Sequence, residues 1–92
     1  MNEEYRKINH PDFENKTFEI SNFGNIKNIK TGNIRSVCKL GRFQVDKSTY
    51  YSVGRLVALT FMTESDIDYS KLKVFHLDKN KQNNRVDNLK WI

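Results

Sequence analysis

The sequence predicts an α+β fold with a small antiparallel sheet, one helix and a C-terminal hairpin. Three observations support this prediction. Apolar and polar residues alternate over residues 17–53, where glycines and asparagines separate the short segments. The apolar spacing becomes helical over 53–62, and two short apolar segments, 72–77 and 86–92, then flank a polar stretch. Alternation bounded by turn residues is typical of antiparallel strands, and a spacing of three to four residues is typical of a helix.

The predicted sheet is organised around a turn. Lys30-Thr31-Gly32-Asn33 lies between Ile29 and Ile34, and it has the composition of a hairpin turn because glycine and asparagine accept a left-handed backbone. Alternating positions of short strands lie on both sides of this turn: Phe18, Ile20, Ile34, Ser36, Cys38, Leu40, Phe43, Val45, Tyr51 and Val53.

The second half of the chain contains the predicted helix and hairpin. An acidic, loop-like segment follows the helix over 63–70, and the polar segment 78–85 connects the two strands of the hairpin. We therefore expect two modules in one compact unit. The antiparallel-sheet module covers 1–52, and the helix with the hairpin covers 53–92.

Length and composition exclude several classes of protein. A chain of 92 residues forms one small domain with a modest core, which argues against a deep substrate cavity. It has no apolar run of membrane-spanning length, and its polar first fifteen residues carry four acidic side chains, unlike a signal or transit peptide. Cys38 is a single cysteine, so neither an internal disulfide nor a cysteine zinc cage is expected. These features predict a cytoplasmic protein.

The net charge of +5 is concentrated in two segments. Residues 27–47 hold six basic side chains and one acidic one, and residues 71–92 hold six basic and two acidic ones. The segment between them, 60–70, holds three acidic side chains and no basic one. This distribution favours a charged face that binds a polyanion. An ordinary solvated surface rich in lysine is the alternative that charge leaves open.

The most informative segment is FHLDKNKQNNRVDNLKW, residues 75–91. It resembles the core of HNH endonucleases of the homing and phage type, in which His-x-Asp-x-Asn is followed by Asn-Asn and Asn-Leu-x-Trp. The upstream segments FEISNFGNI (18–26) and RLVALTF (55–61) are similar to signatures of the modular domain that precedes this core. The resemblance covers the chain from about residue 13 to residue 92.

The resemblance implies a role for each residue of the motif. His76 would be the base that takes a proton from water, which then attacks a phosphodiester, while one divalent metal stabilises the developing charge. Asn88 would orient His76 by holding the other nitrogen of its ring. The remaining polar residues would organise the loop by capping backbone groups: Asp78, Asn80, Asn83 and Asn84.

Three departures from the family pattern predict an impaired site without a metal. Phe75 stands where the family has a metal-binding Asp, Asn or His, and phenylalanine has no lone pair to offer. The second ligand of the family lies on a helix after the tryptophan strand, whereas this sequence ends at Ile92. We therefore expect a hairpin resembling a ββα-metal finger that lacks its last helix. Gly54 occupies the position of a histidine in the upstream signature.

The leading hypothesis is a catalytically impaired HNH-family phage protein that binds nucleic acid, in the first place DNA, without cleaving it and without a cofactor. Such a protein would reside in the cytoplasm of a bacterial host cell. Its basic side chains would contact phosphates along the two basic segments. The candidate residues are Lys27, Lys30, Arg35, Lys39, Arg42, Lys79, Lys81, Arg85 and Lys90.

Two further hypotheses remain open. One is a phage-encoded inhibitor that binds a host protein such as a defence nuclease, in an anti-CRISPR or similar anti-restriction role. It would use exposed aromatic residues (Phe75, Tyr69, Tyr50) and the acidic stretch 64–68. The other is an active, magnesium-dependent nicking enzyme that recovers its metal ligands from Asp78 or by dimerisation.

Overall fold

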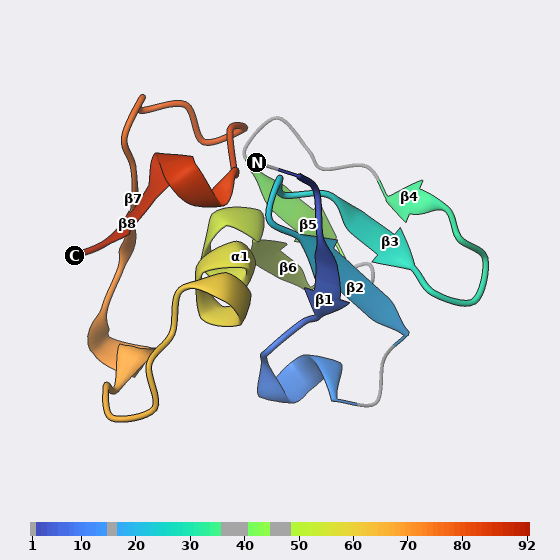
Figure 1. The fold of residues 1–92 in the computed structure, drawn as a ribbon, viewed down its shortest axis with the longest axis horizontal. Coiled ribbons are helices and arrows are strands. Elements are labelled where there is room, and N and C mark those ends of the chain that lie inside the picture. The colour runs from blue at the N-terminus through green and yellow to red at the C-terminus, as the bar shows by residue number, and fades with distance from the viewer. Residues whose placement is uncertain (1, 15–16, 36–40, 45–48) are drawn as a thin grey trace.

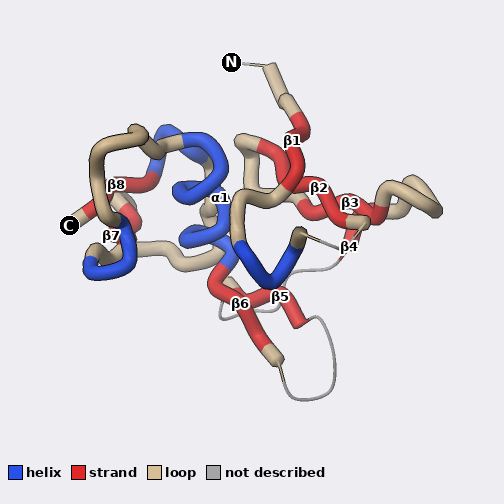
Figure 2. Tube along the Cα trace, turned by 90° about the horizontal axis from the view of Figure 1, so that it is seen from below, coloured by secondary structure: helices blue, strands red, loops and turns tan. Residues whose placement is uncertain are grey.

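The central helix of the protein, α1 (Val53–Phe61), separates a four-stranded sheet from a C-terminal hairpin (Figures 1 and 2). The computed structural model describes residues 2–14, 17–35, 41–44 and 49–92. Short 3-10 turns cover Pro11–Phe13, Tyr69–Lys71 and Val86–Asn88. The strands are β1 (Tyr5–Lys7), β2 (Phe18–Ser21), β3 (Ile26–Asn28), β4 (Ile34–Arg35), β5 (Arg42–Gln44), β6 (Tyr50–Ser52), β7 (Val74–His76) and β8 (Leu89–Trp91).

The strands form three antiparallel groups, which confirms the predicted fold class. The four-stranded sheet has the order β1-β2-β3-β4, while β5 pairs with β6 and β7 pairs with β8. The sequence predicted one sheet over 17–53, so β1 was missed and the division into two groups is a correction. The expected strand positions at 36–40 and at Val45 lie outside the described residues.

In and around the turn between β2 and β3, side-chain oxygens accept hydrogen bonds from backbone N–H groups. Ser21 Oγ accepts hydrogen bonds from the backbone N–H groups of Phe23 (3.2 Å) and Asn25 (3.1 Å). Gly24 adopts a φ of 88°, in the left-handed region that favours glycine. Asn22 Oδ1 accepts from the backbone N–H of Glu4 at 2.8 Å, which ties the start of the chain to this turn.

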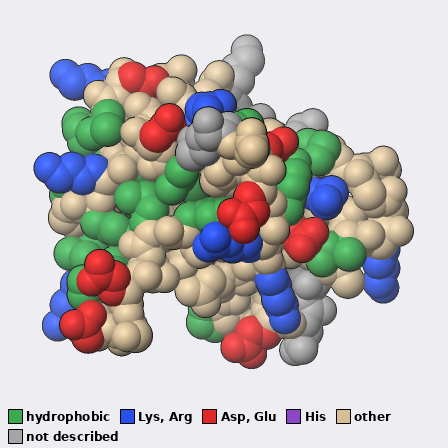
Figure 3. Space-filling view, viewed as in Figure 1, with side chains coloured by type: hydrophobic (Ala, Val, Ile, Leu, Met, Phe, Trp, Pro, Cys, Tyr) green, Lys and Arg blue, Asp and Glu red, His purple; other side chains and the backbone are tan. Residues whose placement is uncertain are grey.

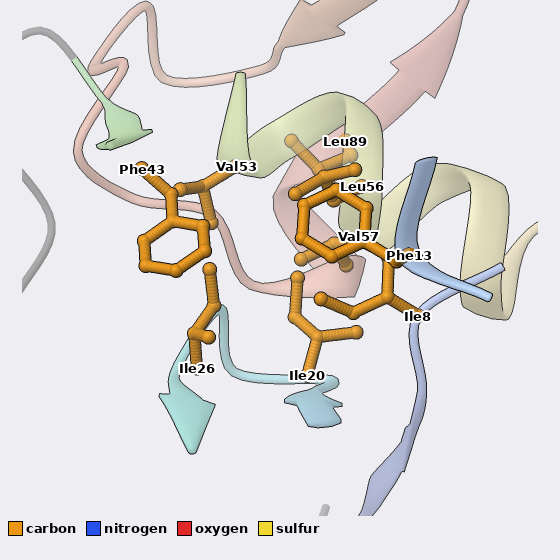
Figure 4. Packing of buried hydrophobic residues seen from close by; sticks show 9 residues of the cluster. All are labelled: Ile8, Phe13, Ile20, Ile26, Phe43, Val53, Leu56, Val57 and Leu89. Carbon is orange, nitrogen blue, oxygen red and sulfur yellow. The ribbon is translucent and has the colours of Figure 1, made fainter. Parts of the chain in front are cut away.

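One hydrophobic core joins all three strand groups and the helix. Its buried side chains are Ile8, Phe13, Ile20, Ile26, Phe43, Val53, Leu56, Val57 and Leu89 (Figure 4). Ile20 and Ile26 face each other across β2 and β3, and Leu89 reaches the same core from β8. The core therefore crosses the predicted module boundary between 52 and 53.

Helix α1 begins and ends with side-chain contacts. Ser52 is the N-cap, and its hydroxyl accepts from the backbone N–H of Arg55 at 3.4 Å. At the other end the Trp91 indole donates to the carbonyl of Met62 at 3.0 Å, so β8 satisfies an acceptor that the helix leaves unpaired. The helix matches the predicted range 53–62 to within one residue.

The C-terminal hairpin presents different side chains on its two faces. Val74 and His76 are half-buried toward the rest of the molecule, whereas Phe75 between them is exposed. Phe75 lies opposite the exposed Lys90 of β8. Because side chains alternate along a strand, His76 and Phe75 point to opposite faces. Within the described residues, no helix is long and apolar enough to cross a membrane.

Candidate functional site

His76 stands at the end of β7, where its ring meets the polar loop of the hairpin. Its Nε2 lies 2.7 Å from Oδ1 of Asn84, a hydrogen-bond distance. The Asn84 side chain belongs to a residue that is only 3% exposed, so this contact is shielded from solvent. The prediction that the His76 ring forms a hydrogen bond with an asparagine is therefore correct. The partner, however, is Asn84 and not Asn88.

Asn88, the predicted partner of His76, has other contacts. Its Oδ1 accepts from the backbone N–H of Asp78 at 3.1 Å. Its Nδ2 donates to Asp78 Oδ1 and to the carbonyl of Asn83, both at 2.9 Å. These bonds use both ends of the amide to hold the two ends of the loop together. Asn88 thus fixes the loop that carries Asn84, which corrects the prediction that Asn88 bonds the ring.

Asp78 is the hub of the loop, as the sequence suggested for this group of residues. Its carboxylate also accepts from the backbone N–H of Asn80 (2.8 Å) and from Nδ2 of Asn83 (2.8 Å). The hydrogen bonds from Asn83, Asn80 and Asn88, followed by the charge of His76, lower the pKa of Asp78. The exposed carboxylate is therefore held in its ionised form next to His76.

Three glycines allow the loop to approach the rest of the molecule. A Cβ added at Gly24 would lie 2.8 Å from the Cβ of Asn84, and one at Gly41 would overlap the carbonyl oxygen of Lys81. A Cβ at Gly54 would lie 3.0 Å from both Asn84 Oδ1 and His76 Nε2. The hydrogen-bonded pair of His76 and Asn84 therefore occupies the space that a side chain at position 54 would need.

His76 lines a hollow of about 260 Å³ together with two exposed cations, Arg42 of β5 and Lys81 of the hairpin loop. The other lining residues are Gly41, Ser52 and Val74. The close approach of Gly41 to the Lys81 backbone brings the two basic segments of the sequence together at this point. Arg42 and Lys81 therefore share a hollow with His76, as no other predicted cation does among the side chains that the structure describes.

Among the predicted phosphate-binding cations whose side chains are described, Lys27 and Arg85 lie against aromatic rings of the protein. Lys27 Nζ lies 4.2 Å from the ring centroid of Tyr5 and 3.9 Å from a Glu19 carboxylate oxygen. The Arg85 guanidinium lies 4.0 Å above the ring of Phe23. Such contacts hold each cation against an aromatic face.

The remaining predicted cations are dispersed. Lys30, Lys79 and Lys90 are exposed, and Lys90 lies on the hairpin face opposite His76. Arg35 contributes its backbone to β4, and Lys39 lies outside the described residues. The turn after β3 and the C-terminal hairpin lie on opposite sides of α1 in both ribbon views (Figures 1 and 2). On the face drawn in Figure 3, Lys and Arg groups alternate with acidic ones rather than forming one continuous patch.

The donor atoms around His76 do not fit the divalent metal of the family. Phe75 has no donor atom, and its side chain is on the face away from His76. Asp78 supplies a carboxylate, but three amide and backbone donors of the loop already bond it. Across residues 2–14, 17–35, 41–44 and 49–92, no group of three His, Cys, Asp or Glu side chains could hold a metal ion.

The aromatic residues predicted for a protein-binding surface differ in exposure. Tyr50 is 51% exposed and Phe75 38% exposed, but Tyr69 is half-buried. Its ring lies 4.8 Å from that of Trp91, and its hydroxyl accepts from the backbone N–H of Glu64. Tyr69 is thus part of the internal structure, which corrects its place in an exposed aromatic patch.

Comparison with known proteins leads from both sequence and structure to HNH endonucleases, which this chain resembles. In sequence it is 36% identical to an uncharacterised HNH endonuclease, L247, of Acanthamoeba polyphaga mimivirus, over 82% of this chain and 20% of that protein. In structure it resembles the HNH homing endonuclease I-HmuI, described for DNA binding and cleavage, with a TM-score of 0.67 and 31% identity. No protein-family model matches the chain.

The extent of these similarities is unequal. The structural match covers 97% of this chain and 52% of the I-HmuI chain. The chain thus spans about half of the solved relative and a fifth of the curated one. The match therefore includes the sheet, the helix and the hairpin.

Proposed function

We propose that this chain binds the sugar-phosphate backbone of DNA at the hollow beside His76 and does not cleave the strand. The observation that carries the proposal is the convergence of Arg42, Lys81 and His76 on one hollow of about 260 Å³. The two cations come from segments about forty residues apart in the sequence. A phosphate is the ligand class that such cations recognise at a surface.

The two cations would act differently on a phosphate. The Arg42 guanidinium can donate two parallel hydrogen bonds to a phosphate, whereas the Lys81 ammonium acts as a compact point charge. Gly41, the residue before Arg42, lies against the Lys81 backbone. This contact limits how far Arg42 and Lys81 can separate. Nucleic acid would therefore meet a pair of charges with restricted spacing.

The residue at position 75 supports binding without cleavage. A base can deprotonate water, but the charge on the phosphate and the leaving oxygen must also be stabilised, and in metal-dependent nucleases the cation does this. Phe75 replaces the family ligand, and the other donor atoms near His76 are committed to the loop. The similarity to nucleases supports nucleic acid as the partner, and Phe75 supports binding without hydrolysis.

A second candidate function, metal-dependent nicking, is favoured by one observation. The Asp78 carboxylate is ionised close to His76, since its pKa is lowered by hydrogen bonds and by the ring. An ionised carboxylate is a suitable ligand for a hard cation. Nicking in magnesium that disappears in His76→Ala would establish this function.

The binding proposal is tested by charge reversal at the hollow. We compare Arg42→Glu combined with Lys81→Glu against Lys7→Glu combined with Lys71→Glu, which makes the same change of charge at exposed lysines elsewhere. Fluorescence anisotropy of labelled duplex DNA is measured at several salt concentrations. The first variant should reduce the magnitude of the salt slope by about two, because each of the two cations neutralises one phosphate.

The control variant should weaken binding much less at the same salt concentration. Equal weakening in the two variants would mean that only the total charge matters, and it would refute a site at the hollow. Circular dichroism of both variants establishes that the fold is retained.

A further inference from the structure

We infer that Asn84 is the positioning residue of His76 and that it fixes which ring nitrogen carries the proton. This inference deepens the proposed function, since it concerns the same site. The carbonyl oxygen of an asparagine side chain can only accept a hydrogen bond. Because Asn84 Oδ1 faces His76 Nε2 at 2.7 Å, we assign the proton of the neutral ring to Nε2 and the lone pair to Nδ1.

The orientation of the Asn84 side chain is determined by the upstream part of the chain. The Cβ position of Gly24 is 2.8 Å from Asn84 Cβ, so the turn between β2 and β3 lies directly against this residue. The backbone N–H of Val86 donates to the carbonyl of Asn22 at 2.8 Å, which attaches the loop to the same turn just beyond Asn84. The turn between β2 and β3 therefore helps to fix the position of the His76 ring, because it holds Asn84.

Helix α1 also packs against the pair of His76 and Asn84. The Cβ position of Gly54 lies 3.0 Å from both bonded atoms, Asn84 Oδ1 and His76 Nε2. This distance is at the limit of close packing, so the ring and the amide have little room to rotate apart. Gly24 packs against Asn84 and Gly54 packs against both bonded atoms, and burial of Asn84 shields the hydrogen bond from water.

This arrangement leaves Nδ1 as the ring atom that can act on a ligand. As a base it would accept a proton, and in the protonated ring it would donate to a phosphate oxygen. Without Asn84 the ring could exchange its tautomer, and the lone pair would not be kept on one atom. Asn88 acts one step further away, because it holds the loop that presents Asn84.

The inference is tested by nuclear magnetic resonance of the two histidine rings in the protein without nucleic acid. In the wild-type chain, the neutral His76 should be protonated on Nε2, with a proton resonance that exchanges slowly with water. Asn84→Leu removes the acceptor at similar size, so this resonance should disappear. Asn84→Asp keeps an acceptor at the same place, so the resonance should persist.

His10, the other histidine of the chain, is the internal reference, since its Nδ1 accepts from the backbone N–H of Asp12 and it is far from Asn84 in sequence. Its signals should stay unchanged in every variant. If Asn84→Leu does not fold, Gly54→Ala gives the same measurement, because the added methyl would displace the ring from the amide and should weaken the His76 resonance.

A His76 ring protonated on Nδ1, or a slowly exchanging Nε2 proton that persists in Asn84→Leu, would overturn the inference. Because no nucleic acid is present, this outcome is separate from a failure of the proposed DNA binding. A protein with the predicted tautomer and no DNA binding would retain the inference and refute the function.

Discussion

At the scale of single residues, Gly24 shows how a turn far from the motif supports the candidate site. It combines a φ of 88° with an almost complete lack of space for a side chain, since Asn84 lies against it. Gly32 has a similar φ of 73° but no atom within 4 Å of its Cβ position. Substitutions at Gly24 and Gly32 therefore distinguish the free-energy cost of a left-handed backbone from the cost of steric overlap with a neighbour.

We predict that Gly24→Ala destabilises the protein by about 2–3 kcal/mol and Gly32→Ala by about 1 kcal/mol. The left-handed backbone costs an alanine about 1 kcal/mol or more at either position, and steric overlap with Asn84 adds a further amount at Gly24 alone. Urea unfolding of the two variants measures the difference. Equal destabilisation would show that Asn84 does not restrict the space for a side chain at Gly24.

Asp78 makes stability depend on pH. Because its pKa in the folded protein is lowered below the ordinary value of 3.8 by its hydrogen bonds, the folded state binds a proton less readily than the unfolded chain. The stabilisation is therefore complete above that value and is lost as the pH falls through the lowered pKa.

We predict that Asp78→Asn removes this acid-sensitive contribution, because the new amide would face the donor Nδ2 of Asn83. Unfolding experiments in the acid range on wild type, Asp78→Asn and Asp66→Asn measure the effect. Asp66, an exposed aspartate after α1, is the matched control. A pH dependence that survives in Asp78→Asn but not in Asp66→Asn would contradict the assignment.

The residue scale is also where sequence reasoning was weakest. The motif identified His76 and the polar loop, since their types and spacing are written in the sequence. It did not identify Asn84 as the partner of the ring, because Asn83, Asn84 and Asn88 are the same residue type. Choosing among them requires the path of the loop, and Gly24 and Gly54 determine that path from distant parts of the chain.

At the scale of elements, helix α1 connects the core to the site. Ser52 caps the helix at the edge of the hollow, and Gly54 in the first turn lies against His76. The buried face of the helix contributes Val53, Leu56 and Val57 to the core. Movement of the first turn of α1 would therefore shift the His76 ring.

We predict that Ser52→Ala lowers the free energy of unfolding by about 1 kcal/mol, the usual cost of removing an N-cap hydroxyl. Ser65→Ala, at an exposed position in the following loop, serves as the control and should change stability little. Thermal or urea unfolding provides the comparison. If the two variants are equally stable, the Ser52 hydroxyl does not contribute to the helix.

The elements were predicted to different degrees for a physical reason. Helix α1 carries strong local periodicity, so its position followed from the sequence. The C-terminal hairpin was also predicted, but 86–88 form a 3-10 turn and not the start of the second strand, which begins at Leu89. β1 has three residues and no apolar alternation. It becomes a strand because it pairs with β2, from Tyr5 opposite Ser21 to Lys7 opposite Glu19, and because Asn22 holds the preceding residue, Glu4. The division of the predicted sheet likewise depends on which strands meet in space, which local alternation does not determine.

At the scale of the whole molecule, the net charge of +5 proved less informative than the place of individual cations. Lys27 and Arg85 lie on aromatic rings of the protein, and Lys90 lies on the hairpin face away from His76. Arg42 and Lys81 meet because Gly41 allows two distant segments to touch. Segment charges cannot predict such a meeting, since they contain no information on which segments are neighbours.

The measurement that tests the central claim most directly is fluorescence anisotropy of labelled duplex and single-stranded DNA over a range of salt concentrations, with and without magnesium. The same samples are then run on a gel to detect nicks. We predict binding that weakens steeply as salt rises, with the DNA intact in magnesium. No binding at low salt would contradict the claim of a nucleic-acid partner, and nicking that is lost in His76→Ala would contradict the claim that this chain binds without cleaving.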